Sequence, residues 1–293
     1  MLGAAGIADS ELLPAMRAAA GSEVLAIASR DPQRALRMAV RHSVPRVHPN
    51  YEALLGDPEV DAVYVALSND AHHPWTLRAL AAGKHVLCEK PLALNAGQGE
   101  EMAAAARSSG RLLMEAFMYR FLPRTRDLVG SLEGRVIRHL HASFGFTIRD
   151  PDNYRMRAEL GGGALYDVGC YCVDVARWLL GEPDAVSAYM RGVDVDLSTG
   201  ALLHFESGAT ASLFASFESP EHQVLEVVTD REVLRIEKPF GATEPVSPYQ
   251  LMLEEFTAAA ASGGPAPLPV EWSLGNLRVL DAIRSAGVGA LPT

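Results

Sequence analysis

Between residues 22 and about 115, short β-branched runs alternate with helical stretches rich in alanine and leucine. Such alternation is typical of βα units, whose strands lie parallel in one sheet. The run 63–67 is apolar at every position, as burial of both faces of a sheet requires. We therefore predict a doubly wound α/β domain here. Its predicted strands are Glu23–Ala28, Asp61–Leu67, Lys84–Cys88 and Arg111–Glu115, and its predicted helices are Pro32–Arg41, His73–Ala82 and Ala96–Ser108.

After about residue 119 the pattern changes to consecutive strands joined by turns of hairpin length, such as 206–208. Strands linked in this way form a largely antiparallel sheet. We therefore predict domains at 1–118 and 119–293, the second of them α+β with an open, mostly antiparallel sheet. The predicted elements of the second domain are the helices 167–180, 249–261 and 273–285 and the strands 185–189, 201–205, 210–217, 224–228 and 233–236.

Composition excludes several classes of protein. The chain has 293 residues and a formal net charge of −10, which disfavours binding to nucleic acid and to anionic membranes. No apolar run approaches the roughly 18 residues of a membrane span. Residues 1–6 include no basic region ahead of an apolar stretch, so no secretory signal is predicted. The three cysteines, an odd number, favour a reduced, cytoplasmic protein. No metal site is predicted.

The segment Gly3–Ala8 fits a G-x-A-x-x-A form of the dinucleotide-binding fingerprint, in which Gly3, Ala5, Gly6 and Ile7 let the backbone approach a pyrophosphate. A flexible N-terminus is the alternative interpretation. The first strand, however, which normally precedes such a glycine loop, is represented by residues 1–2 alone. We therefore expect a truncated first strand, with loss of ladder hydrogen bonds and of the platform that orients the loop.

The predicted strand Glu23–Ala28 is followed by Ser29 and Arg30, where a site that prefers NAD usually has an acidic residue. A hydroxyl group followed by a guanidinium suits a 2′-phosphate instead, so the sequence favours NADP(H), with NAD as the alternative. A solvated arginine at the start of a surface helix explains the same residues without a ligand.

Polar residues also follow the next two strands, at the sheet edge where open α/β sheets bind ligands. Leu67 ends one of these strands, and Asn69 and His72 follow it, although His72 could equally be a packing residue. Glu89 and Lys90 follow the next strand, and Lys90 can lower the pKa of a neighbouring acid. In isolation, Glu-Lys-Pro is more often a surface turn.

A glycine run at 161–163 leads into a helix that carries Asp167 and Tyr171 four residues apart, on one face. A carboxylate beside a phenol can orient a sugar hydroxyl and exchange its proton. With Lys90, Tyr171 is a candidate general acid and base. The alternative is a buried tyrosine and an aspartate that stabilises a helix start.

These motifs, in the order in which they occur along the chain, resemble those of the glucose-fructose oxidoreductase / inositol dehydrogenase family. The resemblance covers essentially the whole chain. The most specific segments are 89–91, 114–121 and 159–171. They resemble the branch of dimeric dihydrodiol dehydrogenases, NADP-dependent D-xylose 1-dehydrogenases and sugar ketoreductases. Tyr171 stands where inositol dehydrogenase-like members have histidine, and Leu122 stands where relatives often have a histidine.

The resemblance implies a Rossmann domain for residues 1–118 and a substrate-binding and oligomerisation domain for residues 119–293. It implies a cis bond before Pro91, a cofactor site that includes the residues named above, and a homodimer or higher oligomer formed through the C-terminal sheet. Tyr171 would transfer the proton, Lys90 would assist, and Asp167 would orient the substrate.

Together these inferences predict an NADP(H)-dependent oxidoreductase that acts on a sugar or a vicinal diol. The alternative from another class is a non-catalytic NAD(P)-binding regulator with the same fold. A third interpretation is a chain that begins one strand late and is inactive as written.

Overall fold

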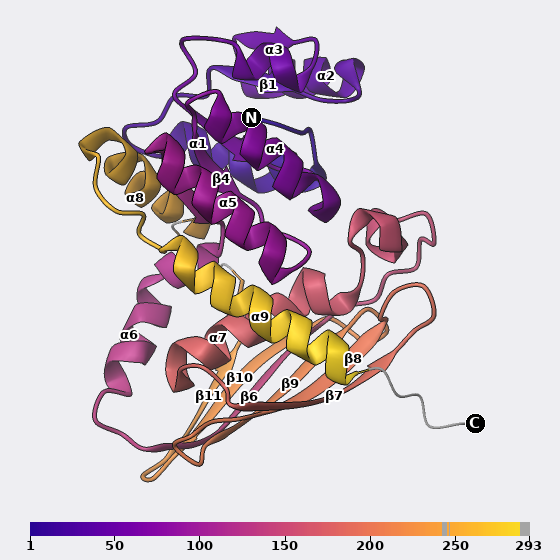
Figure 1. Cartoon of the computed structure of the whole chain (residues 1–293), viewed down its shortest axis with the longest axis vertical. Helices are drawn as coiled ribbons and strands as arrows, with labels where there is room; N and C mark the ends of the chain where they lie inside the picture. Colours follow the sequence, from indigo (N-terminus) through magenta and orange to yellow (C-terminus); the bar gives the residue numbers. More distant parts are fainter. Residues whose placement is uncertain (242–244, 246, 288–293) are drawn as a thin grey trace. The chain divides into compact units, whose positions relative to one another are not determined.

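The computed structural model describes residues 1–241, 245 and 247–287. It divides into two compact units. The first unit contains residues 1–93, 97–121 and 247–273, and the second contains 94–96, 122–241 and 274–287. Figure 1 follows the chain from the indigo N-terminus to the yellow helix α9. The predicted second domain, residues 119–293, includes residues 247–273. In the structure these residues belong to the first unit.

The first unit is built around a parallel sheet. The short strands β1 and β2 pair with each other, β3, β4 and β5 form a second group, and Leu2 joins the groups by bridging to Ala28 and to Val65 in parallel. The spatial order is therefore β2, β1, Leu2, β3, β4, β5. The strands are β1 Ala26–Ala28, β2 Arg46–His48, β3 Ala62–Val65, β4 His85–Cys88 and β5 Leu113–Glu115.

Helical segments connect these strands. A helix runs over residues 6–18 and includes η1 and α1, and α8 packs against α1 although it lies far away in the sequence. Asp31 caps α2 by accepting from the N–H groups of Gln33 and Arg34 at 2.9 and 3.1 Å, which explains where α2 begins. The segments are η1 Ala8–Leu12, α1 Leu13–Ala18, α2 Pro32–His42, α3 Tyr51–Leu55, α4 Asn69–Ala81, α5 Ala96–Ser109, η2 Met118–Phe121 and α8 Pro248–Ser262.

The second unit contains a six-stranded sheet in the order β11, β10, β6, β9, β8, β7. All neighbours are antiparallel except β6 and β9. The helix α7 packs against β6 and β9 (Figure 1). The elements are α6 Pro123–Ser131, β6 Ile137–Gly145, η3 Tyr154–Met156, η4 Ala158–Leu160, η5 Leu165–Gly169, α7 Cys170–Leu180, β7 Ala185–Arg191, β8 Ser198–His204, β9 Thr210–Ser216, β10 His222–Thr229, β11 Val233–Glu237 and α9 Val270–Ala286.

The predicted fold class is confirmed, a parallel α/β sheet followed by a mostly antiparallel one. We predicted that the platform beneath the glycine loop would be lost with the first strand. This prediction is wrong, because the residues directly before the loop pair with both neighbouring strands. Leu2 N–H donates to Tyr64 O at 2.9 Å, and Ala66 N–H donates to Leu2 O at 2.9 Å. On the other side, Gly3 N–H donates to Ala28 O at 2.9 Å. Residues 1–3 thus complete the central strand at its carboxyl end.

Candidate active site

The glycine turn leaves the sheet between β1 and β3. Gly3 has φ +100°, and a Cβ added there would lie 2.2 Å from Ala66 O, so this position requires glycine. The helix over residues 6–18 starts directly after the turn, where Ala8 N–H donates to Ala5 O at 3.1 Å. Gly6 is exposed, and nothing lies within 4 Å of its ideal Cβ position. A close backbone turn at a helix N-terminus, open at Gly6, fits the phosphates of a dinucleotide.

Ser29 and Arg30 follow β1, beside this turn. The Ser29 hydroxyl accepts from Asp31 N–H at 3.2 Å, which holds the backbone in a tight turn before α2. Arg30 is exposed and lies next to Tyr51. Burial raises the pKa of the Tyr51 phenol above its usual value, and hydrogen bonds with Arg30 offset only part of this rise. The guanidinium is thus held at the carboxyl edge of the sheet and accessible to solvent.

His72, predicted near the cofactor, is fully buried in α4. Its Nδ1 lies 2.8 Å from Pro91 O and its Nε2 lies 3.2 Å from Leu67 O, and burial lowers its pKa. Both ring nitrogens therefore face backbone carbonyls of the two loops that follow β3 and β4. We expect His72 to act on the site by holding these loops together. Asn69 is buried at the start of the same helix, and Leu67 is partly exposed.

The loop after β4 carries Glu89 and Lys90, both partly exposed. Tyr64 of the neighbouring strand donates its hydroxyl proton to Glu89 Oε1 at 2.7 Å. The peptide bond between Lys90 and Pro91 is cis, as the resemblance implied. Leu92 N–H donates at 2.8 Å to the buried carboxylate of Glu115. Contacts on both sides thus fix the backbone that presents Lys90.

All the predicted cofactor residues therefore lie at one place, the carboxyl edge of the first-unit sheet. They come from the turn after Leu2 and from the loops after β1, β3 and β4. The set consists of Gly3, Ala5, Gly6, Ile7, Ser29, Arg30, Leu67, Asn69, His72, Glu89 and Lys90.

In the second unit the glycine run is required by close packing. A Cβ on Gly162 would lie 2.4 Å from Arg155 O, and one on Gly163, which has φ +115°, would lie 2.1 Å from Asp196 Oδ1. Asp196 accepts from Leu165 N–H and from the Thr199 hydroxyl, each at 2.7 Å. Burial raises the pKa of Asp196 to about 6. Asp196 thus anchors the start of the helical segment that carries the candidate catalytic residues.

Asp167 and Tyr171 lie on that segment, which begins as the π-helical turn η5 and continues as α7. Arg155 Nε donates to Asp167 Oδ2 at 2.7 Å, so the carboxylate is oriented and paired with a cation. The Tyr171 ring lies 5.7 Å from the Phe144 ring and 5.4 Å from the Phe240 ring, measured between centroids. Only 6% of Tyr171 and 7% of Asp167 is exposed, so both are shielded from bulk water. π-Helical turns are frequent at functional sites.

Four of the residues around this helical segment were absent from the sequence-based candidates: Phe144, Arg155, Asp196 and Phe240. Each reaches the helix from a distant segment, so local spacing gives no signal for it. Leu122, the position where the resemblance implied a histidine in many relatives, is fully buried directly before α6.

No helix of the described residues is long and apolar enough to cross a membrane. Residues 1–117 match the family described as an oxidoreductase family with an NAD-binding Rossmann fold. Residues 128–235 match the GFO/IDH/MocA C-terminal domain.

Two of the following named relatives match nearly the whole chain, and the third matches about two thirds of it. It is 37% identical to a D-xylose 1-dehydrogenase (NADP(+)) of Haloferax volcanii over 99% of this chain and 97% of the relative. A 3-ketoreductase from Actinomadura kijaniata, solved in complex with NADP and TDP-benzene, superimposes with a TM-score of 0.87 at 33% identity, covering 97% of this chain and 96% of that one. A trans-1,2-dihydrobenzene-1,2-diol dehydrogenase of Xenopus tropicalis is 38% identical over 65% of this chain and 60% of the relative.

Proposed function

This chain belongs to the GFO/IDH/MocA family of oxidoreductases, and from this premise we propose that it transfers a hydride between NADP(H) and a hydroxyl-bearing carbon of a sugar or a vicinal diol. The observation that carries the proposal is the turn at Gly3, a backbone position with positive φ that only glycine fits, at a helix N-terminus with an open Gly6 close by. Relatives that act on D-xylose and on a diol support the substrate class.

The residues of the first unit fit the cofactor by their chemistry. The N–H groups at the start of the helix over residues 6–18 would hold the pyrophosphate. Ser29 and Arg30 would hold the 2′-phosphate, because a hydroxyl and a planar guanidinium donate several hydrogen bonds to its oxygens. When bound, the nicotinamide accepts a hydride from the substrate carbon or returns one.

The proton of the reaction is assigned to Tyr171. During oxidation of the alcohol its phenolate would accept the hydroxyl proton, and during reduction of the carbonyl its phenol would donate one. The ammonium of Lys90 would lower the pKa of that phenol. Asp167, oriented by Arg155, would accept a hydrogen bond from a second substrate hydroxyl, which explains a preference for sugars and diols.

Two further features belong to the proposal. The three cysteines are free and buried, which supports a reduced, cytoplasmic environment. The resemblance supports a homodimer or higher oligomer formed through the second-unit sheet, whose exposed large apolar residues include Tyr189 and Leu202.

The direct test is a turnover screen of the wild-type chain. Aldoses, polyols and trans-diols are offered with NADP⁺ and with NAD⁺, keto-sugars are offered with NADPH and NADH, and formation or loss of reduced nicotinamide is followed by absorbance. We expect turnover within one of these substrate classes, faster with the phosphorylated cofactor. Tight NADPH binding without turnover of any substrate would favour the non-catalytic regulator.

Cofactor preference is tested at Arg30. Replacing Arg30 with alanine should weaken NADPH binding by about tenfold or more, because charge-assisted hydrogen bonds contribute roughly 1.5–3 kcal/mol. NADH binding should stay unchanged. Arg34→Ala is the matched control, since Arg34 is also exposed and lies close to Arg30 in the sequence, in the first turn of α2. Equal losses of NADPH affinity in the two variants would mean that Arg30 contributes only positive charge and makes no specific contact with the 2′-phosphate.

A further inference from the structure

The candidate catalytic segment, which is η5 followed by α7, begins without a capping side chain of its own. Its N-cap residue is Ala164, which follows the glycines at 161–163, so none of these residues has a side-chain acceptor. The first N–H groups of a helix have no partner within the helix and need acceptors from elsewhere. Asp196, in the loop between β7 and β8, provides two. Its side chain accepts from Leu165 N–H at 2.7 Å, and its backbone O accepts from Ala164 N–H at 2.9 Å.

The capping carboxylate of Asp196 is held on both sides. Its Oδ2 accepts from Leu165 N–H and from the Thr199 hydroxyl of β8, each at 2.7 Å. Its Oδ1 lies against Gly163, where an added Cβ would come within 2.1 Å of it. The oxygen that caps the segment is thus fixed by β8 on one side and by the glycine turn on the other.

A shift of this cap would pass directly to the candidate catalytic residues. Asp167 N–H donates to Gly163 O at 3.1 Å, and Gly163 is the residue against which Asp196 packs. Asp167 lies two positions after Leu165 and Tyr171 six positions after it, on one continuous helical segment. Misplacement by about 1 Å can lower a rate by about 10²-fold. The cap therefore helps to place both side chains.

The charge of Asp196 works against the cap. Burial raises the pKa of its carboxyl from the usual 3.8 to about 6. Hydrogen bonds from Thr199 and Leu165 offset part of this rise, and so does the charge of Arg284 on α9. Tyr166 of η5 has its own pKa raised to about 12 and stays neutral. Because a raised pKa means that folding favours the neutral acid, the segment gains from the acceptor oxygen of Asp196 and not from its charge.

We propose that Asp196 positions Asp167 and Tyr171 for proton transfer, and that it does so through the acceptor oxygen Oδ2 and not through its charge. It acts on them through the backbone at 163–165. The kinetic consequence rests on the proposed function, whereas the cap itself is measured on the protein without substrate.

Two substitutions of Asp196 separate the oxygen from the charge. Asp196→Asn keeps an acceptor oxygen of the same reach, and Asp196→Ala removes it. We expect Asp196→Asn to retain kcat within about twofold, and Asp196→Ala to lower kcat by about 10–100-fold without a change in the Kd for NADPH, because misplaced groups lose rate and not cofactor binding. Amide hydrogen exchange at 163–171 should be faster than in the wild type only in the alanine variant.

A milder substitution, Thr199→Val, decides the question if the alanine variant does not fold. Valine keeps the β-branched shape that suits β8, but it cannot donate to Asp196 Oδ2. The carboxylate then caps Leu165 with less restraint. We expect kcat to fall by about two- to tenfold, the effect of one lost hydrogen bond, and exchange at 163–171 to become faster.

Thermal stability tests the part of the proposal that concerns charge. The pKa of Asp196 is higher in the folded protein than its usual value, so its charge costs stability above about pH 6, and this cost disappears as the pH falls toward about 4. Asp196→Asn should therefore have a higher Tm than the wild type near about pH 8, and the difference should shrink as the solution is acidified.

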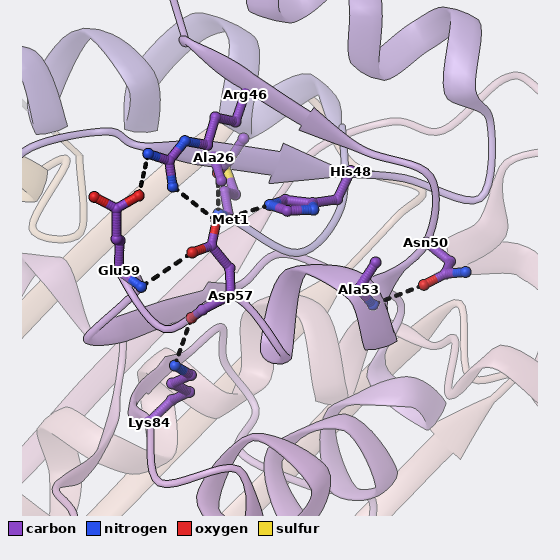
Figure 2. Close-up of polar contacts among 9 residues, drawn as sticks. All are labelled: Met1, Ala26, Arg46, His48, Asn50, Ala53, Asp57, Glu59 and Lys84. Atoms are coloured by element: carbon purple, nitrogen blue, oxygen red, sulfur yellow. Dashed lines mark hydrogen bonds and ion pairs between the residues drawn. The ribbon is translucent and has the colours of Figure 1, made fainter.

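Asp57 of the first unit is the matched control, because its contacts favour the charged form (Figure 2). This buried carboxylate accepts from Glu59 N–H and from Arg46, each at 3.0 Å. These contacts hold the pKa of Asp57 below its usual value. Asp57→Asn should therefore lower Tm near about pH 8, opposite to Asp196→Asn, and should leave kcat unchanged.

Wild-type kcat and wild-type exchange in Asp196→Ala and Thr199→Val would overturn the proposal. Equal losses of kcat in Asp196→Asn and Asp196→Ala would also overturn it, because the charge and not the oxygen would then matter. Absence of turnover by the wild-type chain would refute the proposed function instead. That result is distinct, since faster exchange in Asp196→Ala would still establish the cap.

Discussion

Replacing Tyr171 with phenylalanine should lower kcat by about 10²–10⁴-fold and leave the Kd for NADPH within about twofold of the wild type, because one positioned proton-transfer group contributes a factor of this size. The loss of a single oxygen keeps the ring contacts with Phe144 and Phe240, so the fold should be preserved. Steady-state kinetics on the best substrate of the screen, with NADPH titration by fluorescence, measure both quantities.

The matched control is Tyr166→Phe in the same helical segment. Tyr166 is equally buried, and its hydroxyl donates to Leu94 O and accepts from Arg284. Its loss should lower Tm but leave kcat close to the wild-type value. If Tyr171→Phe retains wild-type kcat, or if both variants lose activity equally, Tyr171 is not the proton-transfer residue.

Lys90 enters the same assay. Lys90→Ala should lower kcat, because the phenol that loses a neighbouring ammonium becomes a weaker acid. The limb of the pH–rate profile that reports this phenol, the acidic limb in oxidation and the basic limb in reduction, should move to higher pH. Lys90→Arg keeps the charge and should restore part of the activity. A purely structural lysine would change Tm without moving the pH profile.

Some elements of the fold can be predicted from their own sequence, whereas others depend on contacts with distant segments. The strand β3 has no charged or strongly polar residue, and β4 is apolar after His85. Helices bound both strands, so their sequence alone identifies them. The missed strand β6 alternates polar and apolar residues, and its histidines His139 and His141 contact hydroxyl groups of β9. Its place in the centre of the sheet depends on pairing with β9 and β10, which are far away in the sequence.

The residues of the candidate site likewise divide into those that the sequence predicts and those that depend on packing. The residues at the carboxyl edge of the first-unit sheet could be predicted because parallel strands bring their carboxyl ends together. The anchoring role of Asp196 could not, because 31 positions separate it from Leu165, whose N–H it accepts. Burial of His72 between two backbone carbonyls likewise follows from packing rather than from local pattern.

Gly3→Ala should have the largest effect on the cofactor site. Its methyl group would lie 2.2 Å from Ala66 O at φ +100°, so either the turn or the end of β3 must move. Movement breaks the hydrogen bonds of Gly3 to Ala28 and of Ala66 to Leu2, both 2.9 Å long. We expect a loss of about 3 kcal/mol or more in the free energy of unfolding, measured by urea denaturation, and no measurable NADPH binding by calorimetry.

Gly6→Ala is the control that separates strain from ligand contact. Nothing lies within 4 Å of its ideal Cβ, and Gly6 is the first residue of a helix, where alanine is favoured. Its unfolding free energy should therefore equal or exceed that of the wild type, whereas its NADPH affinity should fall because the methyl group occupies the space of the pyrophosphate. Wild-type NADPH affinity in both variants would place the dinucleotide elsewhere in the first unit, since neither the turn nor the helix start would then contact it.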